Sequence, residues 1–323
     1  MKDLILFGDC RESLKTFATY DQKARMCVTS PPYYGLRNYG DEDKQIGMEQ
    51  SPEEFVQNLV EVFSLVRDAL TDDGTLWLNL GDSYYNYRSD GNYPKQTVSK
   101  TNQDLPSFSP VRGNKLEGLK SKDLIGIPWM VAFALRADGW YLRQDIIWHK
   151  PNPMPESVKD RCTKAHEYIF LLSKSKNYYY NNEAIKEPAK DWGTRDRTKG
   201  KYHNPGTGLQ PHSGLTKSYD RKNKRSVWTV NKKPYKGAHF ATYPEELIEP
   251  CILAGSEKGD IILDPFMGSG TTAMVAKKNS RAYLGCELHE EYASLQTARI
   301  SSIPNKFPLY YVYTNQGARC LRH

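Results

Sequence analysis

Cysteine is sparse in this chain, and its spacing excludes two kinds of small, cross-linked domain. The 323 residues contain six cysteines, and no two of them form a C-x-x-C pair. Zinc ribbons and disulfide-bonded secreted domains need cysteines at short, regular spacings. The sequence therefore predicts neither a structural zinc site nor a disulfide framework, and it favours the reducing environment of the cytoplasm.

Long apolar runs and internal repeats are also missing. The first apolar run, Leu4–Phe7, stops at Gly8 and Asp9, far short of the roughly 20 residues of a membrane-spanning helix. Hydrophobic residues make up 38% and charged residues 26% of the chain, which is typical of a soluble globular protein. We therefore expect no membrane association, and either one large domain with insertions or two smaller ones.

Acidic residues are few in one segment of the chain, and the net positive charge of the protein comes entirely from that segment. The net charge is +7, and the stretch from Glu183 to Lys236 holds 14 Lys and Arg against 5 Asp and Glu. A positive region on a nearly neutral body is typical of a protein that binds a polyanion. A solvated basic loop would have the same composition, so charge alone leaves both interpretations open.

A glycine-rich turn near the end of the chain indicates a nucleotide-type ligand site. Residues 259–263 predict a buried strand, residues 273–278 a helix, and residues 282–287 a second strand that ends in Glu287. Between the first two lies Asp264-Pro265-Phe266-Met267-Gly268-Ser269-Gly270-Thr271-Thr272, whose glycines let backbone N–H groups approach a ligand closely. The turn lacks the lysine of a P-loop and the third glycine of a dinucleotide-binding turn, which argues against an NTPase and an NAD-dependent dehydrogenase.

The tetrapeptide Ser30-Pro31-Pro32-Tyr33 follows another predicted strand, residues 24–29. Its two prolines fix φ and remove two N–H donors, so that the local carbonyl groups point outward without internal partners. These carbonyl groups and the Ser30 side chain offer hydrogen-bond acceptors, and Tyr33 offers a flat aromatic face.

Taken together, the tetrapeptide and the glycine turn resemble the S-adenosylmethionine-dependent, amino-methylating DNA methyltransferases. In that family an F-x-G-x-G turn binds the cofactor, and an S/D/N-P-P-Y/F/W tetrapeptide meets the target base. The exocyclic amine of a base is a poor nucleophile, because its lone pair is delocalised into the ring. The resemblance implies that a carbonyl group and the Ser30 side chain accept the two hydrogens of the amine and localise that lone pair, and that Tyr33 stacks on the extruded base. The order here, tetrapeptide first and cofactor turn last, resembles the group called beta. The resemblance implies S-adenosyl-L-methionine as cofactor, double-stranded DNA as substrate and no metal. It admits a cognate restriction endonuclease and a homodimer as further partners.

The resemblance also implies a set of site residues. They are Ser30, Pro31, Pro32 and Tyr33 as catalytic residues, and Asp9, Thr242, Asp264, Phe266, Gly268, Ser269, Gly270, Thr271 and Glu287 as cofactor-binding residues. Asp9 would lie near the adenine end of the cofactor, but it could equally be the N-cap of the next helix. Thr242 belongs to a segment that lines the methionine end in the family. His149, His166 and Glu167 match no standard ligand spacing, so we expect them to make polar or structural contacts rather than to bind a metal.

The first residue of the tetrapeptide suggests the target base. Serine at this position is commoner in family members that methylate cytosine N4, and aspartate in those that methylate adenine N6. We therefore expect methylation of cytosine N4, with adenine N6 as the alternative. RNA and protein amino-methylases usually carry asparagine in place of Ser30, and a non-catalytic DNA-binding module would not need both motifs. Both of these functions are less favoured.

Alternating strand and helix patterns predict an α/β fold, a doubly wound and mostly parallel sheet of the class I methyltransferase kind with permuted motif order. We expect residues 1–182 and 237–323 to form the catalytic and cofactor-binding domain. Residues 183–236 are the predicted target-recognition region, and residues 86–121 a flexible insertion.

The clearest predicted helix begins at Ser51-Pro52-Glu53-Glu54, with an N-cap serine, a first-turn proline and a glutamate three residues after the serine. Apolar residues at helical spacing continue to Leu70, and Asp72-Asp73-Gly74 is predicted to end the helix. The other predicted elements are strands at 4–7, 75–80, 141–149 and 168–172, and helices from about 11, at 124–136, at 245–254 and after 287 to about 300.

Overall fold

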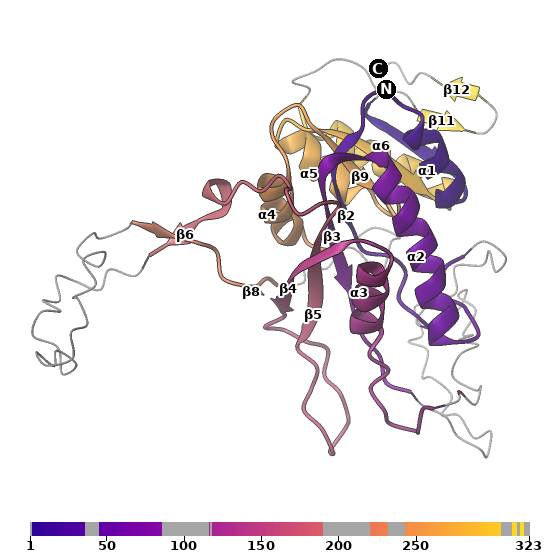
Figure 1. The fold of residues 1–323 in the computed structure, drawn as a ribbon, viewed down its shortest axis with the longest axis vertical. Helices are drawn as coiled ribbons and strands as arrows, with labels where there is room; N and C mark the ends of the chain where they lie inside the picture. Colours follow the sequence, from indigo (N-terminus) through magenta and orange to yellow (C-terminus); the bar gives the residue numbers. More distant parts are fainter. Residues whose placement is uncertain are drawn as a thin grey trace, which may run out of the picture.

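The computed structural model describes residues 2–35, 45–85, 116, 118–189, 220–231, 243–304, 312–314 and 317–319, and all statements on structure refer to these (Figure 1). Among them, no helix is both long and apolar enough to cross a membrane. The predicted insertion at 86–121 lies mostly outside the described residues, as does much of the predicted recognition region at 183–236.

One sheet of ten strands forms the centre of the molecule. In chain order these strands are β1 (Leu4–Phe7), β2 (Ala24–Thr29), β3 (Leu70–Leu80), β4 (Tyr141–His149), β5 (His166–Ser173), β8 (Val227–Thr229), β9 (Ile261–Asp264), β10 (Ala282–Glu287), β11 (Val312–Thr314) and β12 (Gly317–Arg319). Their spatial order is β12-β11-β1-β10-β9-β2-β3-β5-β4-β8. Neighbours pair in parallel except at β3–β5, β5–β4 and β11–β12. The prediction of a mostly parallel sheet is confirmed.

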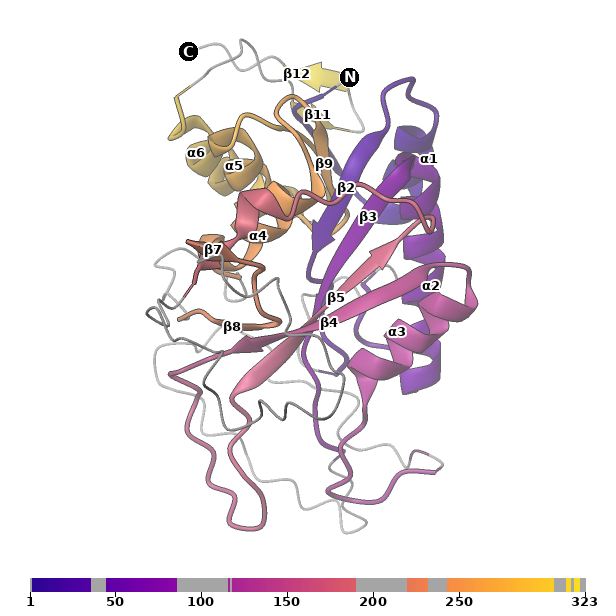
Figure 2. The ribbon, with the colours of Figure 1, turned by 60° about the vertical axis from the view of Figure 1, so that its left-hand side comes forward.

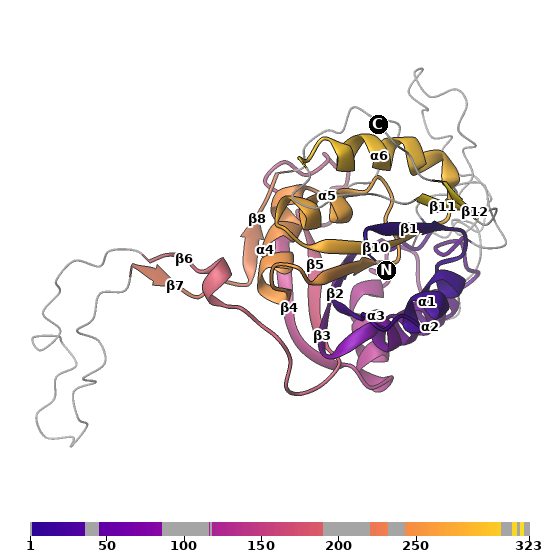
Figure 3. The same cartoon turned by 90° about the horizontal axis from the view of Figure 1, so that it is seen from above.

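Helices cover both faces of this sheet (Figures 2 and 3). One face carries α1 (Cys10–Ala18), α2 (Pro52–Ala69) and α3 (Ile127–Ala137), and the other carries α4 (Glu245–Gly255), α5 (Thr271–Lys278) and α6 (Ala293–Ser301). Short 3₁₀ helices, η2 (Glu183–Ile185) and η5 (Glu290–Tyr292), and a separate pair of strands, β6 (Glu187–Pro188) and β7 (Arg221–Lys222), complete the described elements. The doubly wound arrangement is the predicted one.

The sheet separates two hydrophobic cores. Cys27 of β2 belongs to the core under α1, α2 and α3, whereas its neighbours Met26 and Val28 belong to the core under α4, α5 and α6. All three side chains are buried. A strand that is buried on both faces carries apolar side chains on both, as Met26, Cys27 and Val28 do here.

The predicted start of α2 is confirmed, but its predicted end is wrong. The backbone N–H of Glu54 donates to Ser51 Oγ at 3.2 Å, and Pro52 occupies the first turn. Leu70 already has an extended backbone, and it pairs with Ala24 of β2. The pairing then shifts register before Met26 meets Thr75, so the residues expected to end the helix lie inside β3. Pairing with a neighbouring strand outweighs the local turn signal.

The start of α3 also differs from the prediction, and a carboxylate explains where it lies. Leu124, the predicted first residue, forms an isolated bridge with Tyr84 instead. The helix begins at Ile127, where Asp82 Oδ1 accepts hydrogen bonds from the N–H groups of Gly126 and Ile127 at 3.0 and 3.2 Å. Asp82 thus satisfies N–H groups that have no partner within the helix.

Candidate active site

The predicted site residues come together because parallel strands end at the same edge of the sheet. In the register of β1 and β10, Phe7 lies opposite Glu287. Strands β10 and β9 are adjacent, and β9 lies beside β2. The edge therefore collects the ends of four strands, with Asp9, Glu287, Asp264 and Ser30 at or just beyond them. This is the ligand-binding edge of a doubly wound fold.

The glycine turn lies directly against the acid of the neighbouring strand. The backbone N–H of Gly268 donates to Glu287 Oε2 at 2.7 Å, and the side-chain amide of Gln296 donates to the Gly268 carbonyl at 2.7 Å. Gly268 and Gly270 both have positive φ, of 53° and 82°. A Cβ added at Gly270 would lie 3.3 Å from Cα of Gln296. Glycine is needed here both for the backbone conformation and for the close approach of α6.

Burial sets the charge behaviour of Glu287. The side chain is 7% exposed, and loss of solvent raises the pKa of Glu287 to about 7, while hydrogen bonds from the N–H groups of His289 and Gly268 oppose that rise. The His289 N–H donates to Oε1 at 3.0 Å. Burial thus favours the neutral acid of Glu287, whereas hydroxyl donors of a ligand would favour the ionised carboxylate.

Asp264 connects the glycine turn to the tetrapeptide. Its side chain is 1% exposed, and its Oδ1 accepts hydrogen bonds from Thr29 Oγ1 at 2.5 Å and from the Phe266 N–H at 3.0 Å. Its Oδ2 accepts from Tyr243 Oη at 3.0 Å and from the Thr272 hydroxyl. Burial raises the pKa of Asp264, and these four donors oppose the rise. Thr29 immediately precedes Ser30, so one buried carboxylate joins two motifs that lie 235 positions apart in the chain.

The remaining turn residues are held from the side of α6. Arg299 donates to Thr271 Oγ1 at 2.9 Å and to the Ser269 hydroxyl, and both hydroxyl side chains are buried. Phe266 is half-buried and packs against the core under α1. The side chains of Ser269 and Thr271 thus face the protein. The N–H groups of Phe266, Met267, Gly268 and Gly270 also donate within it, to Asp264, Cys286, Glu287 and Met267 respectively.

The tetrapeptide is anchored through the phenol of Tyr33. Its hydroxyl donates to Glu167 Oε2 at 2.7 Å and lies 3.2 Å from Asn79 Oδ1. Burial and the Glu167 carboxylate raise the pKa of Tyr33 well above its usual range. The phenol therefore stays protonated and acts as a hydrogen-bond donor.

Two residues of this anchor were not predicted as site residues. Lys150 forms an ion pair with Glu167, with side chains 8% and 14% exposed. Glu167 was expected to make a polar or structural contact, and Lys150 was not singled out. Neither belongs to a recognisable motif, because strand pairing rather than sequence spacing brings them to Tyr33. Among the described residues, no cluster of His, Cys, Asp and Glu could hold a metal ion.

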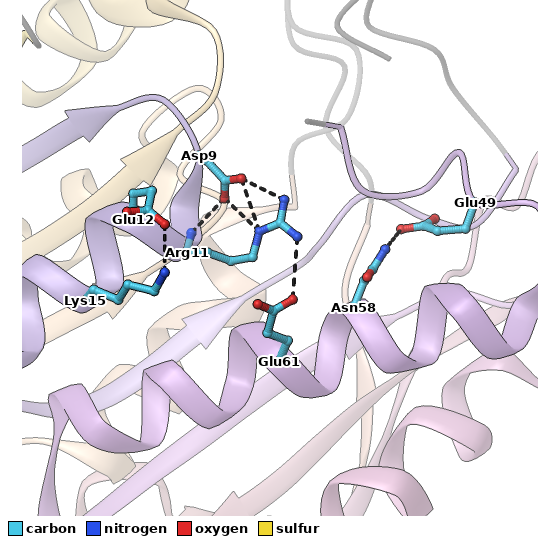
Figure 4. A network of polar contacts seen from close by, with 7 residues as sticks. All are labelled: Asp9, Arg11, Glu12, Lys15, Glu49, Asn58 and Glu61. Carbon is cyan, nitrogen blue, oxygen red and sulfur yellow. Dashed lines mark hydrogen bonds and ion pairs between the residues drawn. The ribbon is translucent and has the colours of Figure 1, made fainter. Parts of the chain in front are cut away.

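Asp9 acts as the N-cap of α1, which is one of the two roles considered for it. The Arg11 N–H donates to Asp9 Oδ1 at 2.8 Å, and the Arg11 guanidinium donates to both carboxylate oxygens (Figure 4). Arg11 also pairs with Glu61 of α2 at 3.5 Å. The carboxylate is occupied by its own helix, and contact with a cofactor remains a prediction. Thr242 lies outside the described residues, next to Tyr243.

The described parts of the basic segment are partly neutralised. Glu187 pairs with Arg225 at 2.6 Å and with Lys222 at 3.4 Å, while Lys224 lies over the ring of Trp228. Trp228 is 5% exposed and packs in the core with β4, because β8 joins the central sheet. Trp228 therefore packs inside the protein and does not lie on a surface where it could contact a base. The other aromatic residues of the segment, Trp192, Tyr202, Tyr219 and Tyr235, lie outside the described residues.

A doubly wound sheet with a glycine turn and an acid at its carboxyl edge defines an α/β enzyme with a nucleotide-type cofactor site. A family model described as DNA methylase matches residues 24–298. The type II methyltransferase M.Cfr9I of Citrobacter freundii is 49% identical over 85% of this chain and 81% of its own length. M.SmaI of Serratia marcescens is 48% identical over 92% of this chain and 90% of its own length.

Solved structures have the same fold. PvuII DNA methyltransferase, named as cytosine-N4-specific, superposes with a TM-score of 0.59 at 17% identity, over 95% of this chain and 89% of that one. TTHA0409 of Thermus thermophilus, complexed with S-adenosyl-L-methionine, superposes with a TM-score of 0.57 at 23% identity, over 96% and 98%. The chain belongs to the DNA methylase family: it is an S-adenosylmethionine-dependent enzyme that methylates amino groups of DNA.

Proposed function

We propose that this enzyme methylates the N4 amine of cytosine at a specific sequence in double-stranded DNA. The observation that carries the proposal is the buried hydrogen bond from Thr29 to Asp264, 2.5 Å long, which fixes Ser30 next to the glycine turn. A base at the tetrapeptide and a cofactor at the turn would then meet at one edge of the sheet. The serine at the first position favours cytosine N4 over adenine N6.

The proposed cofactor contacts lie at the glycine turn and at the end of β10. S-adenosyl-L-methionine, when bound, supplies an electrophilic methyl group on a sulfonium centre. Backbone N–H groups from Phe266 to Gly270 would bind it, in exchange for hydrogen bonds that most of them donate within the protein. Glu287 would accept hydrogen bonds from the ribose hydroxyls of the cofactor. Asp9 and Thr242 complete the proposed cofactor site, together with the backbone of Ser269 and Thr271. Asp264 would act mainly by holding the turn.

Catalysis by these residues is a matter of positioning. Ser30 and a carbonyl group of the Pro31-Pro32 turn would accept the two hydrogens of the target amine and localise its lone pair. Tyr33 would stack on the extruded base. The proton of the amine would leave after methyl transfer, so that no strong base is required.

The remaining parts of the proposal concern DNA and partners. Residues 183–236 would contact the DNA and select the sequence, with Lys and Arg at phosphates and polar side chains at base edges. Because the curated relatives are named type II methyltransferases, we also propose a cognate restriction endonuclease that recognises the same sequence. A homodimer is a further part of the proposal, and the mass of the protein in solution, with and without DNA, tests it. The cytoplasm is the proposed location.

Mass analysis of nucleosides tests the choice of base. DNA methylated by the purified protein is digested to nucleosides, which are separated and weighed, with a Ser30→Ala variant as the control for background methylation. N4-methylcytosine is the expected product. N6-methyladenine would show that the target base is adenine, and it would leave the proposed site residues unchanged. C5-methylcytosine would overturn the proposed chemistry, because that reaction needs a cysteine nucleophile that the tetrapeptide does not contain.

A further inference from the structure

A chain of three polar side chains leads from the interior of the protein to the tetrapeptide. Lys150 pairs with Glu167, and Glu167 accepts the hydroxyl hydrogen of Tyr33 at 2.7 Å. The members come from three parts of the sheet, since Lys150 follows β4, Glu167 lies in β5, and the tetrapeptide follows β2.

The backbone of β4 and β5 fixes the positions of Lys150 and Glu167. Glu167 lies opposite Trp148 in the antiparallel pair of β5 and β4, and the Lys150 N–H donates to the Ala165 carbonyl at 2.8 Å. The Lys150 ammonium also lies 4.3 Å from the centre of the Trp148 ring. The ion pair with Glu167 and the contact with the Trp148 ring hold the Lys150 ammonium in a position that is shielded from solvent. Glu167 therefore keeps a fixed, charged partner.

The ring of Tyr33 has no room to turn. A Cβ added at Gly81 would lie only 2.5 Å from Cε2 of Tyr33, so the ring rests directly on the backbone of the chain that follows β3. On the same side, Asn79 Oδ1 lies 3.2 Å from the phenol oxygen. With the ring and its hydroxyl both held, the direction in which Tyr33 donates is set by Glu167.

We propose that the Lys150–Glu167 ion pair is a positioning device for methyl transfer, which acts through Tyr33 on the tetrapeptide. Glu167 holds the hydroxyl of Tyr33, and the backbone at Gly81 supports its ring. Because Tyr33 directly follows Ser30-Pro31-Pro32 in the chain, fixing Tyr33 also fixes the acceptors that the target amine needs. The ion pair does this without touching the base or the cofactor. The inference rests on the proposed role of Ser30 and Tyr33.

A double-mutant cycle between Tyr33→Phe and Glu167→Gln tests this proposal. Tyr33→Phe keeps the stacking ring and removes only the hydroxyl, and Glu167→Gln removes the charge. Because the lost hydrogen bond involves a charged group, each variant is expected to lower kcat about tenfold to a hundredfold. DNA capture and S-adenosylmethionine affinity should be unchanged. The double variant should be no slower than Tyr33→Phe alone, since both changes remove the same hydrogen bond between Tyr33 and Glu167.

Three controls separate positioning from stability. Glu156→Gln breaks the Arg161–Glu156 ion pair, which lies in the same connection between β4 and β5 without touching Tyr33, and it should leave kcat unchanged. If Glu167→Gln does not fold because Lys150 is left unpaired, the combined change of Lys150→Gln and Glu167→Gln removes both charges, and it should show the same loss of kcat. Fluorescence of 2-aminopurine at the target position reports base capture separately from turnover.

The outcomes also separate this inference from the proposed function. Additive losses in the double-mutant cycle, an unchanged kcat in Glu167→Gln, or an equal loss of S-adenosylmethionine affinity would overturn the positioning role. The ratios are measured on whichever base the unmodified enzyme methylates, so a change of base from cytosine to adenine does not affect them. If Ser30→Ala methylates at the unmodified rate, the proposed catalytic role of the tetrapeptide fails, and the positioning role fails with it.

Discussion

At the scale of single residues, Tyr33 has two separable parts, a ring and a hydroxyl. The hydroxyl is bound to Glu167, whereas the ring is the part that the proposal assigns to the extruded base. Tyr33→Ala removes both. Loss of stacking is expected to weaken base capture by about tenfold to a hundredfold, because stacking on an aromatic ring stabilises a base by about 1–3 kcal/mol. Fluorescence of 2-aminopurine in the target position measures this loss.

Tyr33→Phe is the matched control, because it keeps the ring. Its base capture should equal that of the unmodified protein. If Tyr33→Ala captured the base as well as the unmodified protein does, stacking on Tyr33 would have to be abandoned.

Glu287 predicts a pH dependence of cofactor binding. Its pKa is raised to about 7 by burial, and a carboxylate that accepts ribose hydroxyls must be ionised. Binding therefore lowers this pKa, and affinity should be constant above pH 7 and fall by up to about tenfold per pH unit below it. Calorimetric titration with S-adenosyl-L-methionine between pH 5.5 and pH 8 measures the slope. Glu287→Gln should bind weakly with no such slope, and a flat profile in the unmodified protein would contradict the proposed contact.

At the scale of elements, the turn between β9 and α5 depends on glycine at a definite position. Gly268 has a φ of 53°, and its N–H donates to Glu287. Gly268→Val places a β-branched side chain in a conformation that it rarely adopts, at the point where a ligand must approach. We expect loss of S-adenosylmethionine binding in calorimetry, with a cooperative melting transition retained. Unchanged cofactor affinity in this variant would remove the turn from the proposed site.

The cap of α2 tests an element that contributes stability alone. Ser51→Ala removes the hydrogen bond to the Glu54 N–H, which is expected to cost about 1 kcal/mol. For a domain of this size, that corresponds to a fall in Tm of about 2 °C. Specific activity well below Tm should not change. Ser51→Thr, which keeps the hydroxyl, is the control, and a Tm equal to that of the unmodified protein in Ser51→Ala would show that the cap contributes nothing.

At the scale of the whole molecule, the distribution of charge predicts a salt-dependent affinity for DNA. If the segment from Glu183 to Lys236 contacts phosphates, affinity should fall steeply with salt, with a logarithmic slope of about 0.9 per phosphate neutralised. Neutralising Lys222, Lys224 and Arg225 together should flatten this slope and leave cofactor binding intact. Fluorescence anisotropy of labelled DNA across a salt series measures it.

Two of these three cations already pair with Glu187, so DNA must compete with that carboxylate for them. The matched control neutralises Lys15 and Lys278, which lie on α1 and α5 and pair with Glu12 and Glu245. Their loss lowers the net charge without changing the basic segment, and the slope should stay the same. Equal salt slopes in the triple variant and the unmodified protein would show that the segment is a solvated loop that does not contact phosphates.

The sequence by itself determined the features that depend on local pattern. The apolar run of β2, the capping residues of α2, and the glycine turn with its following helix all appear where the pattern predicts them, because backbone conformation and burial there are set by neighbouring residues. Both motifs were also recognisable from sequence alone, which sufficed for the family.

Only the tertiary structure decided which distant residues meet. Parallel pairing of β2 with β9 brings Thr29 to Asp264, and the hairpin of β4 and β5 brings Lys150 and Glu167 to Tyr33. The end of α2 and the burial of Trp228 followed strand pairing rather than local signals. Hydrogen bonds and buried charges between strands depend on register across the sheet, and no spacing within one segment of the chain encodes that register.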